Sequence, residues 1–422
     1  MSAEAPSDID LELTNLLCRK VSVQIQIRDT TFDYGAWIAA LGSNRTLEEV
    51  TLSLFIFTLG TTPVVVDFFK AIGSLPKLKS LRFQKGKVFC RVPLRLLIEL
   101  LQQKPASLRI LHLQDLELRL ETGTNGQEEI YKLSEALLAL SELERVALAH
   151  CRLKSETKDP ILDPLLKTLL SKESLEHVII SSSRVESLGG FISKAALNEL
   201  FLTCSTWQQQ STSSSSLKEL RLLKFLFSSD ILTALFGTLL LCHSNLQTLL
   251  LSSCHWDNQS IQVLTRYLEQ STHLQELQLL GNCEYFDSHD NAHMELAEAL
   301  QRSPSLRQFS LVPLTGRVKD DNDEEEMIDV CQMAYVEMIK SNYILEEFRC
   351  VRMLSPEWQS ELELYLRLNR AGRRHLCFHN EDDVNVNLND SRKAWVEAIA
   401  AANDDATCIY YFLSLNPSLC TY

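Results

Sequence analysis

One arrangement of apolar residues recurs along most of the chain. In residues 246–256, apolar side chains stand at a first position, at +3 and at +5, which are Leu246, Leu249 and Leu251. The same frame starts at ten leucines spaced 28 to 42 residues apart. These first positions are Leu47, Leu78, Leu108, Leu143, Leu175, Leu217, Leu246, Leu274, Leu306 and Leu345. Such a period predicts stacked structural repeats, because no single repeat can bury its own apolar face.

The pattern predicts one strand and one helix for each repeat. Strict alternation over residues 21–27 indicates a strand with one solvated face, suited to the opening edge of a sheet. Between the frames, apolar residues at i, i+3, i+4 and i+7 indicate helices at 64–72, 128–140, 231–241, 260–268 and 294–300. Strands pack about 4.8 Å apart and helices about 8–10 Å apart, so stacking both must bend the array. We therefore predict an α/β solenoid with a parallel concave sheet and convex helices.

The repeats resemble leucine-rich repeats, and those of 28–32 residues resemble the ribonuclease-inhibitor subtype of that family. In the family, position +8 holds Asn or Cys, which hydrogen-bonds the turn after each strand. Cys151, Cys254 and Asn282 match that position. The match is absent at Gly86, Leu116, Ser183, Phe225, Leu314 and Met353. The resemblance implies a horseshoe-shaped leucine-rich repeat solenoid.

The frame stops after Met353, and helical patterns follow it. Pro356 suits the first position of a helix that runs through Asn369 and ends at Gly372. Residues 391–402 and 406–415 predict two more helices. An open solenoid end would expose core, so these helices are expected to seal the last repeat.

Three segments are therefore expected, which are a flexible lead at 1–20, the solenoid at 21–354 and a helical cap at 355–422. The cap is expected to pack through Trp358, Tyr365, Trp395 and Phe412. The sequence of the cap resembles the C-terminal segment of a set of uncharacterised leucine-rich repeat proteins from microbial eukaryotes, over residues 365–376, 395–398 and 413–419. That resemblance implies a shared origin of the cap and no activity.

Composition narrows the class of protein. A chain of 422 residues is longer than a single closed hydrophobic core accommodates, so two or more domains or one extended array are expected. A net charge of −14 argues against a general nucleic-acid or anionic-membrane binder. Residues 1–10 lack the basic start of a secretory signal, and the longest apolar run, 231–242, is shorter than the about 20 residues of a membrane span. Twelve cysteines without a CxxC pair suggest reduced thiols, so we expect a cytoplasmic protein, with a nuclear one not excluded.

Named catalytic motifs are missing from the sequence, so no enzyme, cofactor or small-molecule substrate is predicted. Two histidine sets could bind a metal, or could be ordinary polar residues of a loop and a helix. One set is Cys283, Asp287, His289 and His293, and the other is His375, Cys377 and His379. Neither set has the second pair of ligands that would favour a metal.

Two charged segments have a structural and a functional interpretation each. The acidic run at 319–326, with Asp329 beyond it, could be a solvated loop that caps a helix at 327–339, or a docking site for a basic partner. The arginines Arg367, Arg370, Arg373 and Arg374 could compensate a helix C-terminus, or bind a phosphate or carboxylate.

Side chains along a strand alternate between its two faces, so positions +2, +4 and +6 of the frame should face the concave side, opposite the buried positions +3 and +5. Apolar residues gather there from Ala147 onward, and exposed apolar surface usually marks a partner site. The alternative is that long neighbouring side chains or the cap cover them. The predicted partner-binding residues are Ile179, Arg221, Leu223, Leu250, Leu280, Val312 and Arg349.

The sequence thus predicts a non-catalytic scaffold that binds a protein partner on its concave strand face, with no nucleic-acid or membrane partner. The alternative is a regulator of an enzyme, either of the inhibitor type or a GTPase activator. GTPase-activating proteins for Ran-type GTPases combine such repeats with an acidic C-terminal tail, whereas here the acidic run interrupts a repeat.

Overall fold

The computed structural model describes fifteen segments of the chain. They are residues 21–28, 32–55, 59–85, 90–120, 126–154, 163–182, 216–223, 229–242, 245–252, 256–281, 290–312, 325–350, 356–373, 388–402 and 405–415. The chain forms two compact units, residues 1–246 and 247–422, called unit 1 and unit 2 below. Each unit is described by itself.

Unit 1 is built on a sheet whose neighbouring strands are all parallel. In spatial order its strands are β1 (Ser22–Ile27), β2 (Glu49–Leu54), β3 (Ser80–Lys85), β5 (Ile110–Gln114), β7 (Arg145–Lys154), β8 (His177–Ser182) and β9 (Glu219–Leu223). The +3 residues of the frame are register partners, as in Leu81↔Leu111 and Val178↔Leu220. The predicted parallel sheet is confirmed.

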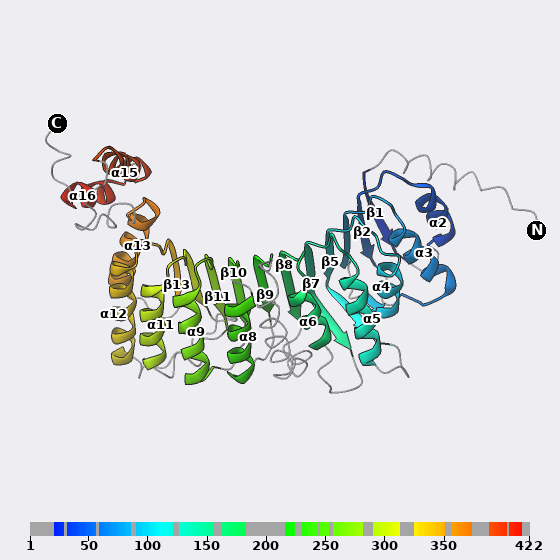
Figure 1. Cartoon of the computed structure of the whole chain (residues 1–422), viewed down its shortest axis with the longest axis horizontal. Helices are drawn as coiled ribbons and strands as arrows, with labels where there is room; N and C mark the ends of the chain where they lie inside the picture. Colours follow the sequence, from blue (N-terminus) through cyan, green and yellow to red (C-terminus); the bar gives the residue numbers. More distant parts are fainter. Residues whose placement is uncertain are drawn as a thin grey trace, which may run out of the picture. The chain divides into compact units, whose positions relative to one another are not determined.

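Helices of unit 1 follow the strands and pack on one face of the sheet (Figure 1). They are α2 (Tyr34–Ser43), α3 (Pro63–Gly73), α4 (Leu94–Leu101), α5 (Gly126–Leu138), α6 (Asp163–Ser171) and α8 (Ser229–Cys242). The helices α2 to α6 pack against one another in chain order. Two short strands that the frame did not predict, β4 (Cys90–Pro93) and β6 (Leu116–Arg119), add a second parallel ladder beside the end of β7.

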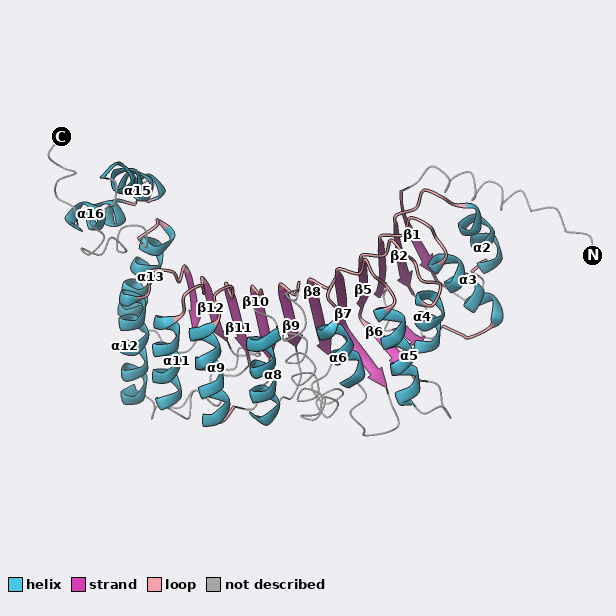
Figure 2. Cartoon of the chain, viewed as in Figure 1, coloured by secondary structure: helices cyan, strands magenta, loops and turns pink. Residues whose placement is uncertain are grey.

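Unit 2 repeats the plan with four parallel strands. They are β10 (Thr248–Ser252), β11 (Glu276–Leu280), β12 (Gln308–Val312) and β13 (Glu347–Cys350). Figure 2 shows the helices of these repeats side by side on one face of the strands, namely α9 (Asn258–Gln270), α11 (Asp290–Arg302) and α12 (Glu325–Ser341). The register Leu249↔Leu277↔Phe309↔Phe348 again joins the +3 positions.

The frame describes the core of both units. All ten first-position leucines are at most 2% exposed, although each stands just before its strand rather than in it. Serines one residue earlier link successive repeats, because their hydroxyls donate to the carbonyl of the preceding first-position leucine. Ser107 donates to Leu78 at 3.0 Å, Ser174 to Leu143 at 2.9 Å and Ser305 to Leu274 at 2.9 Å.

Three further helices complete unit 2, namely α13 (Pro356–Arg370), α15 (Leu388–Ala401) and α16 (Ala406–Leu415). The turn after α13 contains Gly372 at φ 91°, a conformation that side chains rarely adopt. Tyr365, Trp395 and Phe412 lie in one apolar cluster, as predicted, whereas Trp358 is half-buried outside it. The boundary between solenoid and cap at residue 354 stays a prediction.

Candidate interaction surface

The candidate surface is the face of each sheet opposite its repeat helices, called the strand face below. It carries positions +2, +4 and +6, since side chains alternate along a strand. In unit 1, no described helix lies on this face (Figure 1). Its side chains form rows that cross the strands, and the register fixes which residues are neighbours.

The predicted partner-binding residues fall into two groups, one in each unit. In unit 1, Ile179 and Arg221 are register partners, and Leu223 lies two residues beyond Arg221. In unit 2, Leu280 and Val312 are register partners, and Arg349 lies opposite Ser310. The side chain of Val312 lies outside the described residues. A single patch that joins both groups stays a prediction.

The expectation that Leu250 is exposed is wrong. Its side chain is only 5% exposed, while Ile179, Leu223 and Leu280 are half-buried. A residue inside a row has neighbours about 4.8 Å away along the row, and the longer Gln278 is the register partner of Leu250 in β11. Large apolar residues with more than a third of their area exposed, among those described, lie on helices or at the start of β1. The strand face is therefore less apolar than the sequence suggested.

A buried carboxylate organises the strand face of β7, β8 and β9. Glu219, at +2, is 8% exposed. Its Oε2 lies 2.7 Å from His177 Nδ1 and 3.5 Å from Arg145 Nη2, and its Oε1 pairs with Arg221. Burial alone would raise the pKa of Glu219, but the His177 hydrogen bond and the charge of Arg221 outweigh it, so the pKa is lowered. The Glu219 carboxylate therefore stays ionised at neutral pH and holds the three basic side chains around it.

A second group of basic side chains crosses β3, β5 and β7. Arg82 and His112 are register partners at +4, and Arg145 lies at +2 in the next strand. The pKa of His112 is lowered, by burial first and then by the charges of Arg82 and Arg145. The +4 positions hold Arg82, His112 and Arg221, but neither group is complete without position +2. That position reads Arg145, His177 and Glu219 in successive repeats, and it was the signal that the sequence reasoning left unused.

Of the candidate metal ligands, His293 alone lies within the described residues. His293 is buried in unit 2, where its Nδ1 lies 2.8 Å from the hydroxyl of Tyr335 and the two rings meet edge to face. The other members of both histidine sets, Cys283, Asp287, His289, His375, Cys377 and His379, lie outside the described residues. In the part of the chain that the structure describes, no group of three metal-ligating side chains occurs, and no helix is both long and apolar enough to cross a bilayer.

Described members of the arginine cluster have structural partners. Arg367 Nη1 lies 2.6 Å from Asp405 Oδ2, and Arg370 lies 2.9 Å from Glu363. Arg373 is buried and donates to carbonyl oxygens at the C-terminus of α12. These contacts support the interpretation of charge compensation at a helix end. Arg374 and the acidic residues 319–324 lie outside the described residues, and α12 begins at Glu325.

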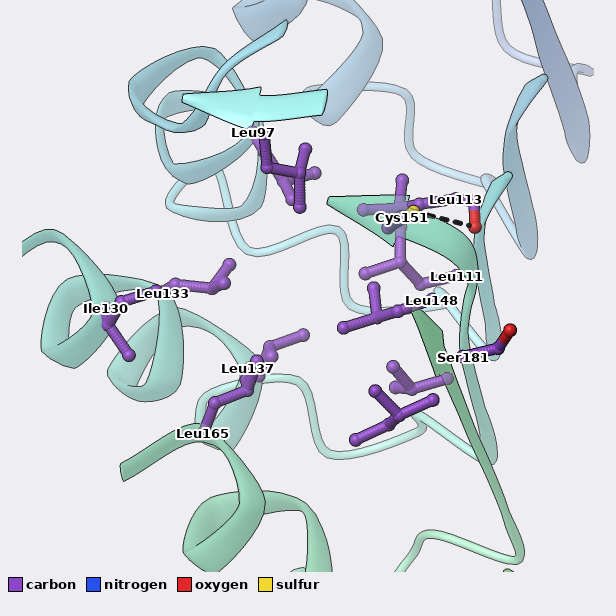
Figure 3. A pocket seen from close by; sticks show the side chains of 13 residues that line it. Leu97, Leu111, Leu113, Ile130, Leu133, Leu137, Leu148, Cys151, Leu165 and Ser181 are labelled. Carbon is purple, nitrogen blue, oxygen red and sulfur yellow. Dashed lines mark hydrogen bonds between the residues drawn. The ribbon is translucent and has the colours of Figure 1, made fainter. Parts of the chain in front are cut away.

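An apolar cavity of about 30 Å³ lies between the sheet and α4, α5 and α6 (Figure 3). Its lining includes Leu111, Leu113 and Cys151, and small-molecule sites are usually about 300–1,000 Å³, so it is a packing void. The thiol of Cys151 donates to Leu113 O at 3.4 Å, an acceptor inside the neighbouring strand β5 rather than in a turn. Burial raises the pKa of this thiol to about 12, so it stays protonated.

No protein-family model and no curated protein matches the sequence. Among solved structures, the leucine-rich repeat-containing protein LegL7 from Legionella pneumophila is similar at 12% identity and a TM-score of 0.36, over 79% of this chain and 96% of that one. A TLR13–ssRNA13 complex is similar at 10% identity and a TM-score of 0.22, over 83% of this chain and 65% of that one. Likenesses this weak carry no argument about function. The leucine-rich repeat fold follows from the chain's own register and repeat spacing.

Proposed function

We propose that this leucine-rich repeat chain is a scaffold that binds another protein on its strand face, without catalysis of its own. The observation that carries the proposal is the open strand face of unit 1. Parallel sheets in folded proteins are usually covered on both faces, whereas here the described helices of unit 1 cover only one. Repeat arrays of this kind use such extended surfaces for binding.

The side chains on that face suit a protein partner. Half-buried Ile179 and Leu223 lie beside the ionised Glu219 and its three basic partners. Protein interfaces combine apolar contact area with arginine and a polar rim in this way. The rigid spacing of the strands fixes these groups before binding, which lowers the entropic cost of association.

Charge placed on the strand face should abolish partner capture. We expect the double variant Ile179→Lys/Leu280→Lys to recover at least tenfold less partner than the wild type, because each lysine places a charge in a half-buried contact. Hot-spot losses of about 2 kcal/mol correspond to that factor or more. The measurement is quantitative mass spectrometry of proteins that co-purify with each tagged chain.

The matched control is the double variant Tyr131→Lys/Leu138→Lys, which places two lysines on exposed positions of α5. It should recover the partner as well as the wild type does. Circular dichroism melting of both variants checks that the fold is retained. Equal recovery by a folded strand-face variant would rule out this surface as the partner site.

A further inference from the structure

Three basic side chains converge on the strand face of β3, β5 and β7. Arg82 is the register partner of His112, and Arg145 is a diagonal neighbour of His112 on the opposite side. Diagonal neighbours in a sheet lie about 7–8 Å apart, within reach of long side chains. Both guanidinium groups also act on the imidazole of His112, since each contributes to lowering its pKa. The three groups therefore share one small volume above β5.

The positive charge of the two arginines is only weakly compensated. Arg82 is exposed, its hydrogen bond goes to Ser80 Oγ at 3.4 Å, and it has no ion pair within the described residues. Arg145 reaches Glu219 only at 3.5 Å, and its buried Nε finds no acceptor in the described part of the chain. A buried donor without an acceptor destabilises the protein, so an added acceptor would be favourable here.

Basic residues at position +1 of the same repeats behave differently. Lys79 lies 2.9 Å from Glu48, and Arg109 lies 3.3 Å from Glu144. Those charges are neutralised by partners in the neighbouring repeat. Weak compensation is therefore a property of the Arg82, His112 and Arg145 group within this part of the sheet.

A carboxylate matches this group better than a polyanion does. Arginine binds carboxylates through two parallel hydrogen bonds. Because the whole chain carries a charge of −14, a locally basic site attracts an acidic group to this part of the surface in preference to the rest. The group is bounded by Glu49 in β2 and Glu219 in β9. A nucleic acid typically needs about 6–10 phosphate contacts and would meet those carboxylates.

We infer that Arg82, His112 and Arg145 form a binding site for an acidic side chain in an extended peptide segment of the partner protein. Half-buried Ile179 lies two strands beyond His112 in the +4 row and offers apolar contact to the neighbouring residues of that segment. This inference rests on the proposed function, because it names the chemistry that the strand face of unit 1 recognises.

Binding should strengthen as the pH falls. The charged groups that face His112 are Arg82 from β3 and Arg145 from β7, while Ile110 and Gln114 beside it on β5 do not titrate. Without ligand, the pKa of His112 lies below its ordinary value of 6.5. A bound carboxylate offsets the arginine charges and raises that pKa, so a proton is taken up on binding. Affinity therefore rises as the pH falls through the interval between the two pKa values, about tenfold for each unit that separates them.

The test measures fluorescence anisotropy of a rhodamine-labelled hepta-glutamate peptide with the purified full-length chain at about 50 mM salt. Hepta-glutamine and hepta-uridylate probes are measured beside it. We expect hepta-glutamate to bind, and Arg82→Gln to weaken it at least tenfold, as charge-assisted hydrogen bonds imply. Arg302→Gln on exposed α11 removes the same charge and should bind like the wild type. His112→Gln should bind with no rise in affinity between pH 8 and pH 5.5.

Several outcomes would overturn the inference. They are no binding of hepta-glutamate to the wild type, equal binding to a folded Arg82→Gln variant, or Arg82-dependent binding of hepta-uridylate alone. Loss of a dimer by Arg82→Gln in ultracentrifugation would assign the site to a second copy of this chain. Partner capture separates the two proposals. If Arg82→Gln still captures the partner while Ile179→Lys/Leu280→Lys does not, the binding site for an acidic side chain is rejected and the proposed function stands. If both variants still capture the partner, the strand face as a whole is rejected.

Discussion

Replacing Arg373 with alanine is expected to lower the free energy of unfolding of the C-terminal helices by about 3 kcal/mol. The side chain is 3% exposed and donates to Ile339 O and Lys340 O at the end of α12. Hydrogen bonds of a charged group contribute about 1.5–3 kcal/mol. The guanidinium also lies 4.5 Å from the ring of Tyr343 and 4.8 Å from that of Tyr365, and desolvated cation–π contacts add about 1–2 kcal/mol.

Hydrogen exchange with mass spectrometry measures this effect directly. Peptides from α13, α15 and α16 should exchange at least tenfold faster in Arg373→Ala, while peptides from β2 and β3 should be unchanged. The control is Arg367→Ala, which removes an exposed ion pair at the same end of α13 and should change exchange little. Equal exchange in Arg373→Ala and the wild type would contradict the role of this arginine as the link between α12 and the terminal helices.

Replacing Leu111 with alanine is expected to lower the free energy of unfolding by about 4 kcal/mol. Leu111 is 1% exposed, stands at the +3 position of its repeat and is paired in register with Leu81 and Val146. Buried leucine-to-alanine changes cost about 2.7–5.0 kcal/mol and cost more when a larger cavity remains. Leu111 already lines the cavity of about 30 Å³, so the deleted methyl groups would enlarge an existing void.

Urea unfolding monitored by circular dichroism measures this loss. The matched control is Leu138→Ala on α5, where the side chain is 49% exposed and the expected change is below about 0.5 kcal/mol. Equal stability of the two variants would mean that Leu111 is not a core position of the sheet.

The repeat frame predicted the architecture because apolar spacing and burial are directly linked. Residues 64–72 became α3, 260–268 became α9, and 294–300 became α11, each with one to four more residues at either end. The strands β4 and β6 were missed because each has only four residues and lies outside the 0, +3 and +5 positions of the frame. The serine contacts between repeats were missed because only leucines defined the frame.

The candidate surface was harder to predict than the core. Of its seven predicted residues, Leu250 is buried, because exposure of a strand-face side chain depends on how long its neighbours are. Arg221 was named for its place in the +4 column and its charge, whereas its position is set by the buried Glu219 in its own strand. Cross-strand pairs such as His177 with Glu219 need the register as well as the residue type, and they join repeats 42 residues apart.

A photocrosslinking measurement tests most directly whether a partner covers the strand face. The photoreactive residue p-benzoylphenylalanine is placed at Ile179 on β8 in one sample and at Leu138 on α5 in another, and each is irradiated with the co-purified partner. We predict a covalent adduct between chain and partner from position 179 and none from position 138. An adduct that forms from position 138 alone would contradict the account and place the partner on the helices.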